Sequence, residues 1–569
     1  MTAAATTSPM KLCRGCGVEY PRSPEHFHPR PEVPEGFRAR CRRCSNKGRR
    51  ARTSENARLA QVARELGVQL PRPALALPPP PPPSPVPAEP IGDDEDTVEV
   101  ERPAAAREPM VLPTEEPARA ERYVFTYAQN ATPVDAPFLA ALLVFCRERN
   151  ARLVVLPGRY KNPTSVVTRD MEHDEWWADD LAPFLFAGRM TIGRLTIYGD
   201  ISIQPTDARP VSGFEVFAGH NSAVFGHPKI EYKTVPSNQR RYPRILTSTG
   251  ACTIPNYVSA KAGKKGEAHH TIGACIIERD PRLFHIRQIY AAPDGSFTDL
   301  DREYTPTGSR QAPRPESVTT ADVHEIKMDP LVDAASFRGP SSICGALRPK
   351  RLIYHDTLDF DTRNHHTRGD FQNRYARATG WKNDNVEVEV TRAIDFLDRT
   401  PEDIEPIVVR SNHDAAYDRW LKEADFREDP VNARFYVATW KAMLDAFDQT
   451  GEWPDAFELL YRQRGRGRAR FLKQDESLMI CEVEHGQHGH VGINGARGSL
   501  GSFSKIGTKI SIGHGHTPGI QDGAFMAGVC NLDQGYNAGL SSWLNTHIIQ
   551  YASGARTLIS IIEGRWRAE

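Results

Sequence analysis

The chain has no apolar run long enough to cross a membrane, although it is 569 residues long. Its first residues lack the apolar segment of a secretory signal. Basic and acidic residues balance at 72 each, so the overall charge indicates no partner. Of only ten cysteines, most are scattered in apolar or mixed sequence, which is typical of reduced thiols. We therefore expect a soluble, cytoplasmic protein of about two to four domains, with no membrane partner.

The clustered cysteines form two CxxC pairs near the N-terminus, namely Cys13, Cys16, Cys41 and Cys44. Two such pairs separated by a short loop match the four thiolate ligands of tetrahedral zinc. Between Lys11 and Arg52, twelve Lys and Arg residues stand against four Glu. We therefore predict a structural Zn²⁺ module at residues 1–53 whose basic surface contacts DNA. The alternatives are a redox CxxC and a solvated basic face.

The composition changes sharply after this module. Residues 54–70 are predicted to form a short amphipathic helix that has Ser54 as its N-cap and Gly67 as its stop signal. Residues 71–119 contain six consecutive prolines and a run of four acidic residues, which predicts a disordered, semi-rigid linker. The linker would tether the zinc module to the main body.

Residues 120–316 are predicted to form an α/β domain. Their sequence begins with a strand–helix–strand pattern at 122–128, 135–149 and 151–156, and continues with β-rich runs. The residues of this domain do not assign it a chemistry.

In residues 317–569, several apolar runs end in side chains that bind metals or transfer protons. They lead, in chain order, into Asp322 and His324, Asp356 and Asp359, Asn412, His413 and Asp414, His485, and His514 and His516. Polar groups at the carboxyl ends of buried strands lie where open α/β sheets bind ligands. Helical patterns at 385–397, 415–423 and 433–447, alternating with the strands, predict a mixed or parallel sheet that is covered on both faces.

The order D-x-H, D-x-x-D, N-H-D, a single His and G-H-x-H resembles the motif set of the calcineurin-like metallophosphoesterases. This resemblance implies a four-layer α/β/β/α sandwich with two divalent metal ions, Mn²⁺ ahead of Mg²⁺, Fe²⁺ or Zn²⁺. In such a site one carboxylate bridges two ions about 3.5–4 Å apart. The implied ligands are Asp322, His324, Asp356 and His516 for one ion, and Asp356, Asn412, His485 and His514 for the other.

The resemblance also implies roles for residues that bind no metal. His413 would face the phosphate and protonate or stabilise the leaving oxygen, while Asp359 and Asp414 would orient the ligands. The sequence departs from the family where His355 and Ser411 replace glycines. The single histidine is ambiguous among His485, His488 and His490; we prefer His485, and His488 is second.

The order of AQNATPV, LPGRYKNPT and RILTSTGACTIPNY resembles the N-terminal half of large phage metallophosphoesterase proteins. These are pre-early proteins implicated in host DNA degradation and DNA transfer. The resemblance implies a phage-encoded, metal-dependent phosphodiesterase that acts on DNA, a nuclease. The alternatives are a phosphatase for a small molecule or a protein, and a non-catalytic protein of DNA binding or transfer.

A Gly-interrupted basic run, 462–470, precedes the single-histidine motif. We predict that its side chains contact DNA phosphates, together with a later arginine and with His365 and His366 beside the metals. The predicted contacts are Arg464, Arg466, Arg468, Arg470 and Arg497. A solvated loop is the alternative. The oligomeric state stays open, an oligomer included.

Overall fold

The computed structural model describes Met10–Leu12, Glu19–Pro21, Phe27–Pro29, Phe37–Cys41, 110–160, 176–238 and 242–568. The chain divides into two compact units, Met1–Arg102 and Pro103–Glu569. In the first unit, β1 (Met10–Leu12) pairs with β2 (Glu19–Pro21) and β3 (Phe27–Pro29) with β4 (Phe37–Cys41), both antiparallel.

Most of the predicted zinc module lies outside the described residues. Cys13, Cys16 and Cys44 are not among them, and of Cys41 only the backbone, at the end of β4, is described. The predicted helix at 54–70 and the linker up to residue 109 lie outside them too, whereas residues 110–119 carry no helix or strand. The zinc site and its DNA contact therefore stay predictions.

A six-stranded sheet in the second unit carries the predicted motif strands, in the order β21-β20-β19-β18-β28-β29. Its strands are β18 (Ser317–Thr319), β19 (Arg351–Tyr354), β20 (Glu405–Val408), β21 (Arg470–Phe471), β28 (Thr546–Gln550) and β29 (Arg556–Ser560). The first four are parallel, and β28 and β29 run antiparallel to their neighbours. The carboxyl ends of β18, β19 and β20 therefore meet at one edge, where ligands bind in open α/β sheets.

Both faces of this sheet are buried. Successive side chains of a strand point to opposite faces, so neighbouring residues pack into different clusters. On β28, Ile548 and Ile549 belong to different hydrophobic clusters, and on β20 so do Ile407 and Val408.

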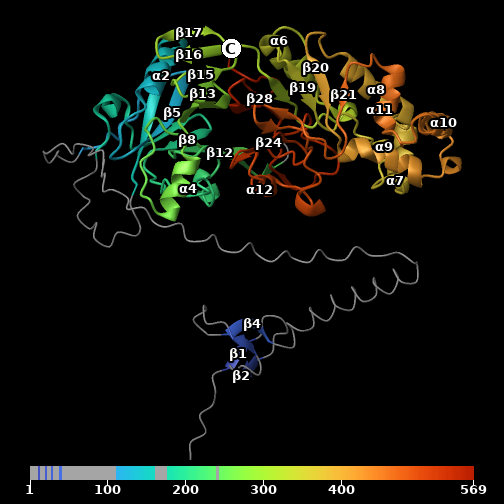
Figure 1. The fold of residues 1–569 in the computed structure, drawn as a ribbon, viewed down its shortest axis with the longest axis horizontal. Helices are drawn as coiled ribbons and strands as arrows, with labels where there is room; N and C mark the ends of the chain where they lie inside the picture. Colours follow the sequence, from blue (N-terminus) through green and yellow to red (C-terminus); the bar gives the residue numbers. More distant parts are fainter. Residues whose placement is uncertain are drawn as a thin grey trace, which may run out of the picture. The chain divides into compact units, whose positions relative to one another are not determined.

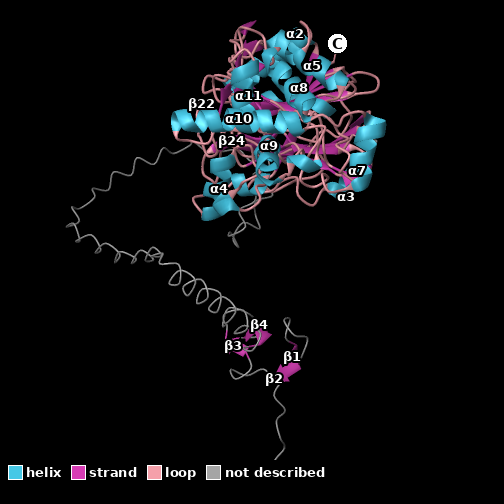
Figure 2. Cartoon of the chain, turned by 90° about the vertical axis from the view of Figure 1, so that its right-hand side faces the viewer, coloured by secondary structure: helices cyan, strands magenta, loops and turns pink. Residues whose placement is uncertain are grey.

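Helices cover one face of the sheet, as the sequence predicts, and several of them lie side by side in Figure 2. They are α5 (Pro330–Phe337), α6 (Ile343–Leu347), α8 (Val386–Asp398), α9 (Asn412–Glu423), α10 (Ala433–Thr450) and α11 (Ala456–Arg464). The short α7 (Phe371–Ala376) follows the loop after β19. Within the described part of the chain, no helix has the length and apolar character that a membrane span requires.

A second sheet, of ten strands, shares hydrophobic clusters with the other face of the first. It joins β22 (Met479–Ile480), β23 (Val483–Glu484), β24 (Lys509–Ile512), β26 (Ala524–Met526) and β25 (Gly519–Gln521) to β10 (Tyr232–Val235), β12 (Arg244–Ser248), β9 (Ser222–Phe225), β8 (Leu195–Tyr198) and β7 (Arg189–Ile192). The short α12 (Leu500–Phe503) packs on it. Because β10 pairs with β25, the segments 120–316 and 317–569 share one sheet. Figure 1 shows β24 and β28, which belong to the second segment, next to elements of the first.

The strand–helix–strand pattern predicted near residue 120 is confirmed. β5 (Arg122–Gln129) and β6 (Ala151–Gly158) are parallel and are connected by α2 (Ala136–Arg149). Asp135 caps α2 by accepting a hydrogen bond from the backbone N–H of Phe138, and Asn150 ends it in a left-handed conformation. β13 (Gly273–Arg279) and β14 (Phe284–Tyr290) complete this four-stranded sheet.

Smaller elements surround these sheets. They are α3 (Glu215–Ala218), α4 (Lys261–His269), the pair β11 (Ser237–Asn238) and β27 (Leu540–Ser541), and the three-stranded sheet of β15 (Phe297–Asp299), β16 (Arg302–Thr305) and β17 (Gly308–Gln311). The second unit is therefore a mixed α/β structure of several sheets.

A buried ion network ties the four-stranded sheet to β15. Arg287 donates two hydrogen bonds to Asp299, at 2.6 and 2.9 Å, and one to Glu278 at 2.9 Å. All three side chains are nearly inaccessible to solvent. Burial alone would raise the pKa of Glu278, but the charge of Arg287, with those of Arg149 and Arg122, lowers it to about 2. The carboxylate is therefore charged in the core.

We expect Arg287→Met to lower the free energy of unfolding by about 3–5 kcal/mol, because it leaves two buried carboxylates without their main cation. Chemical denaturation would measure the loss. Arg427→Met, which removes an exposed arginine paired with Asp425, is the matched control and should change little. Equal small losses in both variants would contradict the expectation.

Candidate metal centre

Four side chains converge where the strands of the two sheets end. Asp322, His324, Asp356 and His516 each offer one ligand atom, and these atoms all lie within 4.8 Å of one another. His516 Nε2 lies 3.1 Å from Asp322 Oδ2 and 3.3 Å from His324 Nε2. All four side chains are buried. The structure thus brings together the four residues that the sequence predicts as ligands of the first ion.

The backbone is unusual at this centre. His324, Asp356, His514 and His516 have positive φ angles of 45°, 46°, 67° and 55°. This left-handed conformation is uncommon for residues other than glycine, and such residues cluster at functional sites. Asp356 and His514 lie two residues after the ends of β19 and β24, and His324 and His516 lie further along the loops after β18 and β24.

Glycine is required beside Asp322. A Cβ atom on Gly513 would lie 2.2 Å from Asp322 Oδ1 and 3.0 Å from the ring of His355. The G-H-x-H motif therefore begins with a residue whose missing side chain lets β24 approach the carboxylate.

Asp359 contacts two histidines of the centre, His324 and His413. Its Oδ1 atom lies 2.8 Å from His324 Nδ1, and Lys327 Nζ lies 2.9 Å from its Oδ2 atom. A proton on Nδ1 that is donated to Asp359 leaves the Nε2 lone pair of His324 free for a cation.

His413 lies at the boundary between the centre and solvent. Its Nδ1 atom lies 2.8 Å from the Asp359 carbonyl oxygen and 3.0 Å from the Asp359 carboxylate. Burial alone would lower the pKa of His413, but the charges of Asp356 and Asp359 raise it to about 10. His413 is therefore placed to hold a proton next to whatever enters the centre.

A second group of ligand atoms comes from Asp322, His355 and His488. His488 Nε2 is 3.3 Å from Asp356 Oδ2 and 3.1 Å from Asn412 Oδ1, and its ring centroid is 5.3 Å from that of His514. Asn412 is the first residue of α9, which Ser411 caps.

The structure brings His488, and not the preferred His485, to the carboxylates, while the choice of ligand stays a prediction. His485 is buried and its nitrogens contact Thr319 Oγ1, at 3.1 Å, and the side-chain oxygen of Gln550. Both histidines follow β23, but only His488 reaches the carboxylates. The sequence analysis also missed His355, whose Nδ1 atom lies 3.2 Å from that of His488.

The carboxylates fit divalent cations. Asp322 Oδ1 and Asp356 Oδ1 are buried and have no hydrogen-bond partner among the described residues. Burial would raise the pKa of Asp356, but the neighbouring charges of His488, His413 and His324 hold it well below its usual value. Ionised oxygens with free lone pairs beside imidazole nitrogens are the donors that Mn²⁺ and similar ions take.

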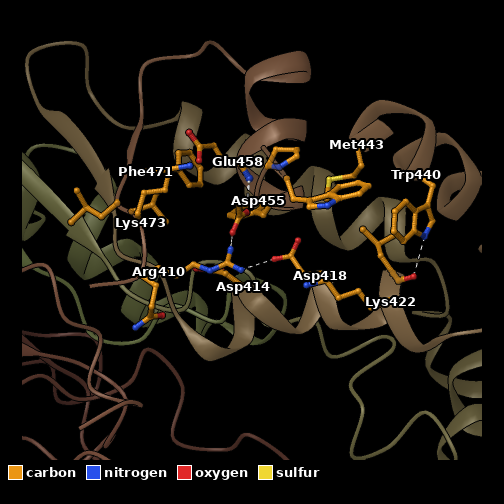
Figure 3. Close-up of a pocket in the computed structure, with 17 residues that line it drawn as sticks. Arg410, Asp414, Asp418, Lys422, Trp440, Met443, Asp455, Glu458, Phe471 and Lys473 are labelled. Atoms are coloured by element: carbon orange, nitrogen blue, oxygen red, sulfur yellow. Dashed lines mark hydrogen bonds and ion pairs between the residues drawn. The ribbon is translucent and has the colours of Figure 1, made fainter. Parts of the chain in front are cut away.

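Asp414 is buried and holds the loop after β19 by a hydrogen bond. Its Oδ1 atom accepts a hydrogen bond of 3.1 Å from the Leu358 backbone N–H. Burial and the charge of Asp356 raise the pKa of Asp414 to about 6. Asp414 also lines a separate cavity of about 370 Å³, in which Arg410 lies between Asp418 and Asp455 (Figure 3).

A cavity of about 530 Å³ gives access to the centre. Besides centre residues such as His413 and His514, it is lined by His365, His366 and Arg497, which the sequence analysis places beside the metals. It is also lined by Lys327, Tyr536 and Trp543, which that analysis missed because they belong to no motif. The ring centroid of Trp543 lies 4.4 Å from that of His516.

The arginines of the 464–470 run do not line this cavity. Arg464, Arg466 and Arg470 form ion pairs with Glu387, Glu402 and Glu476. Arg468 donates hydrogen bonds to backbone carbonyls of residues 400–404, next to the amino end of β20. The centre lies at the carboxyl end of β20, so this part of the predicted groove is wrong and, of the five predicted arginines, only Arg497 lines the cavity.

Comparison with known proteins gives one extensive relationship. Protein A1 of Escherichia phage T5 is 34% identical over 474 residues, which cover 79% of this chain and 83% of the phage protein. No protein-family model matches. The crystal structure of Chaetomium thermophilum Vps29 matches 34% of this chain and 100% of its own with 7% identity and a TM-score of 0.20, which is too low to carry an argument.

We expect Gly513→Ala to weaken Mn²⁺ binding about 10- to 100-fold, because the new methyl group displaces the Asp322 carboxylate. Isothermal titration with Mn²⁺ would measure this. Gly501→Ala is the control, since its Cβ would meet nothing nearer than Gln521 at 3.5 Å. Unchanged affinity in Gly513→Ala would show that Asp322 is not a ligand.

We expect His488→Ala to lose about one bound divalent ion per chain, whereas His485→Ala keeps both, because His485 contacts only Thr319 and Gln550. Metal content after dialysis against Mn²⁺ would distinguish them. The opposite result would restore His485 as the ligand.

Proposed function

This chain belongs to the family of protein A1 of Escherichia phage T5, and we propose that it is a phosphoesterase that uses two divalent metal ions. The observation that carries the proposal is the buried convergence of Asp322, His324, Asp356 and His516. Two ions bound to such a site supply the charge that activates a water and stabilises the leaving oxygen. The proposal includes a calcineurin-like metallophosphoesterase sandwich as the scaffold.

We propose Asp356 as the residue that serves both ions. Its Oδ2 atom lies 3.7 Å from His324 Nε2 in the first ligand group and 3.3 Å from His488 Nε2 in the second. The other oxygen, Oδ1, is buried without a hydrogen-bond partner. A carboxylate within reach of both ligand groups is what a bridging role requires.

His413 is the proton donor in this proposal. It holds its proton against the Asp359 carboxylate, with Nδ1 at 3.0 Å, and lines the cavity in which a phosphate ester would lie. In the reaction it would give a proton to the leaving oxygen, or stabilise that oxygen by a hydrogen bond. Asp359 would hold the ring in place throughout.

We propose DNA as the substrate. The cavity combines the cations Lys327 and Arg497 with the aromatic rings of Tyr536 and Trp543. Cations attract phosphates, and exposed aromatic rings stack on bases, which is how single-stranded nucleic acids are held. Tyr536 is 58% exposed, so its ring is available for such a contact.

A phosphatase of a small molecule is the second candidate. It is favoured by the position of the 464–470 arginines, which do not extend the cavity into a long basic groove. A cavity of about 530 Å³ is also large enough to enclose a small substrate.

We expect the purified protein to cleave plasmid or linear DNA with Mn²⁺ or Mg²⁺ and to be inactive in EDTA. Asp356→Asn should abolish cleavage and lower the metal content, whereas His413→Asn should lower kcat about 10²-fold while both ions stay bound. Gel assays, kcat values and metal analysis measure the three effects.

The outcome also separates the candidates. Metal-dependent hydrolysis of p-nitrophenyl phosphate without DNA cleavage would favour the phosphatase. DNA binding without hydrolysis of either substrate would contradict an enzymatic role. Arg427→Ala, an exposed arginine outside the cavity, is the control for loss of charge.

A further inference from the structure

A second basic cavity lies apart from the metal centre. It has a volume of about 580 Å³, and no carboxylate lines it. Five arginines line it, namely Arg122, Arg149, Arg338, Arg565 and Arg567. None of its lining residues also lines the cavity of the metal centre. We call it the arginine cavity.

Two of these arginines are neutralised by carboxylates outside the cavity. Arg338 pairs with Asp333 at 2.8 Å, and Arg565 pairs with Asp280 at 2.6 Å. Such pairs fix the guanidinium groups in orientation and leave their remaining N–H donors free for a further anion.

Arg122 and Arg149 share a carboxylate that another arginine already holds. Each lies 3.5 Å from Glu278 Oε1, whereas Arg287 binds Glu278 at 2.9 Å and Asp299 at 2.6 Å. The charges of Arg287 and Asp299 cancel, so the Glu278 carboxylate alone is left to balance Arg122 and Arg149.

Arg567 adds to this excess. Its guanidinium lies 4.5 Å from the ring centroid of Trp566, and it forms no ion pair within the part of the chain that the structure describes. Among the described residues, Glu278, Asp333 and Asp280 balance three of the five arginines, which leaves two positive charges. A guanidinium does not lose its proton in proteins, so only an anion relieves the repulsion.

The cavity suits a phosphate group better than a carboxylate group. The side chains of Arg122 and Arg149 are 21% and 38% exposed, so water screens them only partly. The guanidinium fork matches two oxygens of one phosphate. An excess of two charges balances two neighbouring phosphodiesters.

α5 begins near one lining residue of the metal-centre cavity and ends beside one lining residue of the arginine cavity. The chain enters α5 just after Lys327, which lines the cavity of the metal centre, and leaves it at Arg338 in the arginine cavity. A helix of this length extends about 12 Å. A nucleic-acid strand advances about 3.4 Å per nucleotide in a duplex, so a few nucleotides cover such a length.

We propose that the arginine cavity binds backbone phosphates of the nucleic-acid strand whose scissile phosphodiester lies at the metal centre. This rests on the proposed function for the choice of ligand. The cavity then supplies affinity for a polymer and no chemistry, and it replaces the 464–470 run as the polymer-binding surface.

The test uses the full chain carrying Arg149→Ala and Arg567→Ala together. Glu278 keeps Arg287 and Arg122 in this variant, so the core stays paired. Binding of a fluorescein-labelled single-stranded oligonucleotide is followed by anisotropy in EDTA, where no hydrolysis occurs. Affinity should fall about tenfold or more, and the slope of log K against log salt should become shallower by about 1.4, or about 0.7 per lost phosphate contact.

The control variant carries Arg310→Ala and Arg427→Ala, which remove the same charge from exposed ion pairs outside the cavity. It should bind like the wild type. Equal weakening in both variants, or no weakening in the first, overturns the proposal. If the double variant melts early, Arg567→Ala alone carries the test, because it breaks no ion pair among the described residues.

Two further measurements identify the ligand of the cavity and distinguish a failure of this proposal from a failure of the proposed function. Inorganic tripolyphosphate that displaces the oligonucleotide at equal phosphate concentration would make free phosphate the ligand and overturn the nucleic-acid assignment. The double variant should hydrolyse a small phosphodiester as fast as the wild type. A wild type that hydrolyses nothing defeats the proposed function, while the binding result still decides the role of the cavity.

Discussion

Three carboxylates, those of Asp322, Asp356 and Asp359, are buried together, and the neighbouring residues are arranged to keep them ionised. Like charges that are brought out of water repel strongly and lose hydration. The histidines of the centre and Lys327 supply the opposing charge. Four of their oxygens, Asp322 Oδ1 and Oδ2, Asp356 Oδ1 and Asp359 Oδ2, nevertheless have no hydrogen-bond partner among the described residues. The centre therefore offers ionised oxygens with unused lone pairs, which divalent cations bind.

The positions of these side chains depend on two sheets. Parallel strands β18, β19 and β20 of the first sheet bring Asp322, Asp356 and Asn412 to one edge. Parallel strands β23 and β24 of the second bring His488 and His514 to meet them. Gly513 sets how closely the second sheet approaches, because its Cα faces the Asp322 carboxylate. The spacing between the ligand groups is thus set by the packing between sheets.

Sequence alone predicts much of this, because strand ends and ligand types are local properties. The apolar runs before Asp356 and Asn412 end where the strands end, and four ligands of one group were identified correctly as neighbours. The choice between His485 and His488 is not local. Both follow β23, and only the position of Gln550 on the distant β28 shows that His485 is already bonded.

The basic run illustrates the same limit. The arginines between 464 and 470 look like a free cationic patch in the sequence, but their partners, such as Glu387 and Glu402, come from segments far along the chain. The arginine cavity could not be predicted from the sequence, because its residues are far apart in the chain. Arg122, Arg149, Arg338 and Arg567 come from separate segments, and no local pattern unites them.

The pairing of β10 with β25 has a consequence for how this chain can change in evolution. β25 continues through β26 to β24, the strand that leads into Gly513 and His514. A chain that began at residue 317 would leave the Gly519–Gln521 strand with an open edge, which invites pairing with other chains. The two segments therefore share one continuous sheet, and a substitution that displaces β10 would be transmitted through β25 and β26 to the strand before Gly513 and His514.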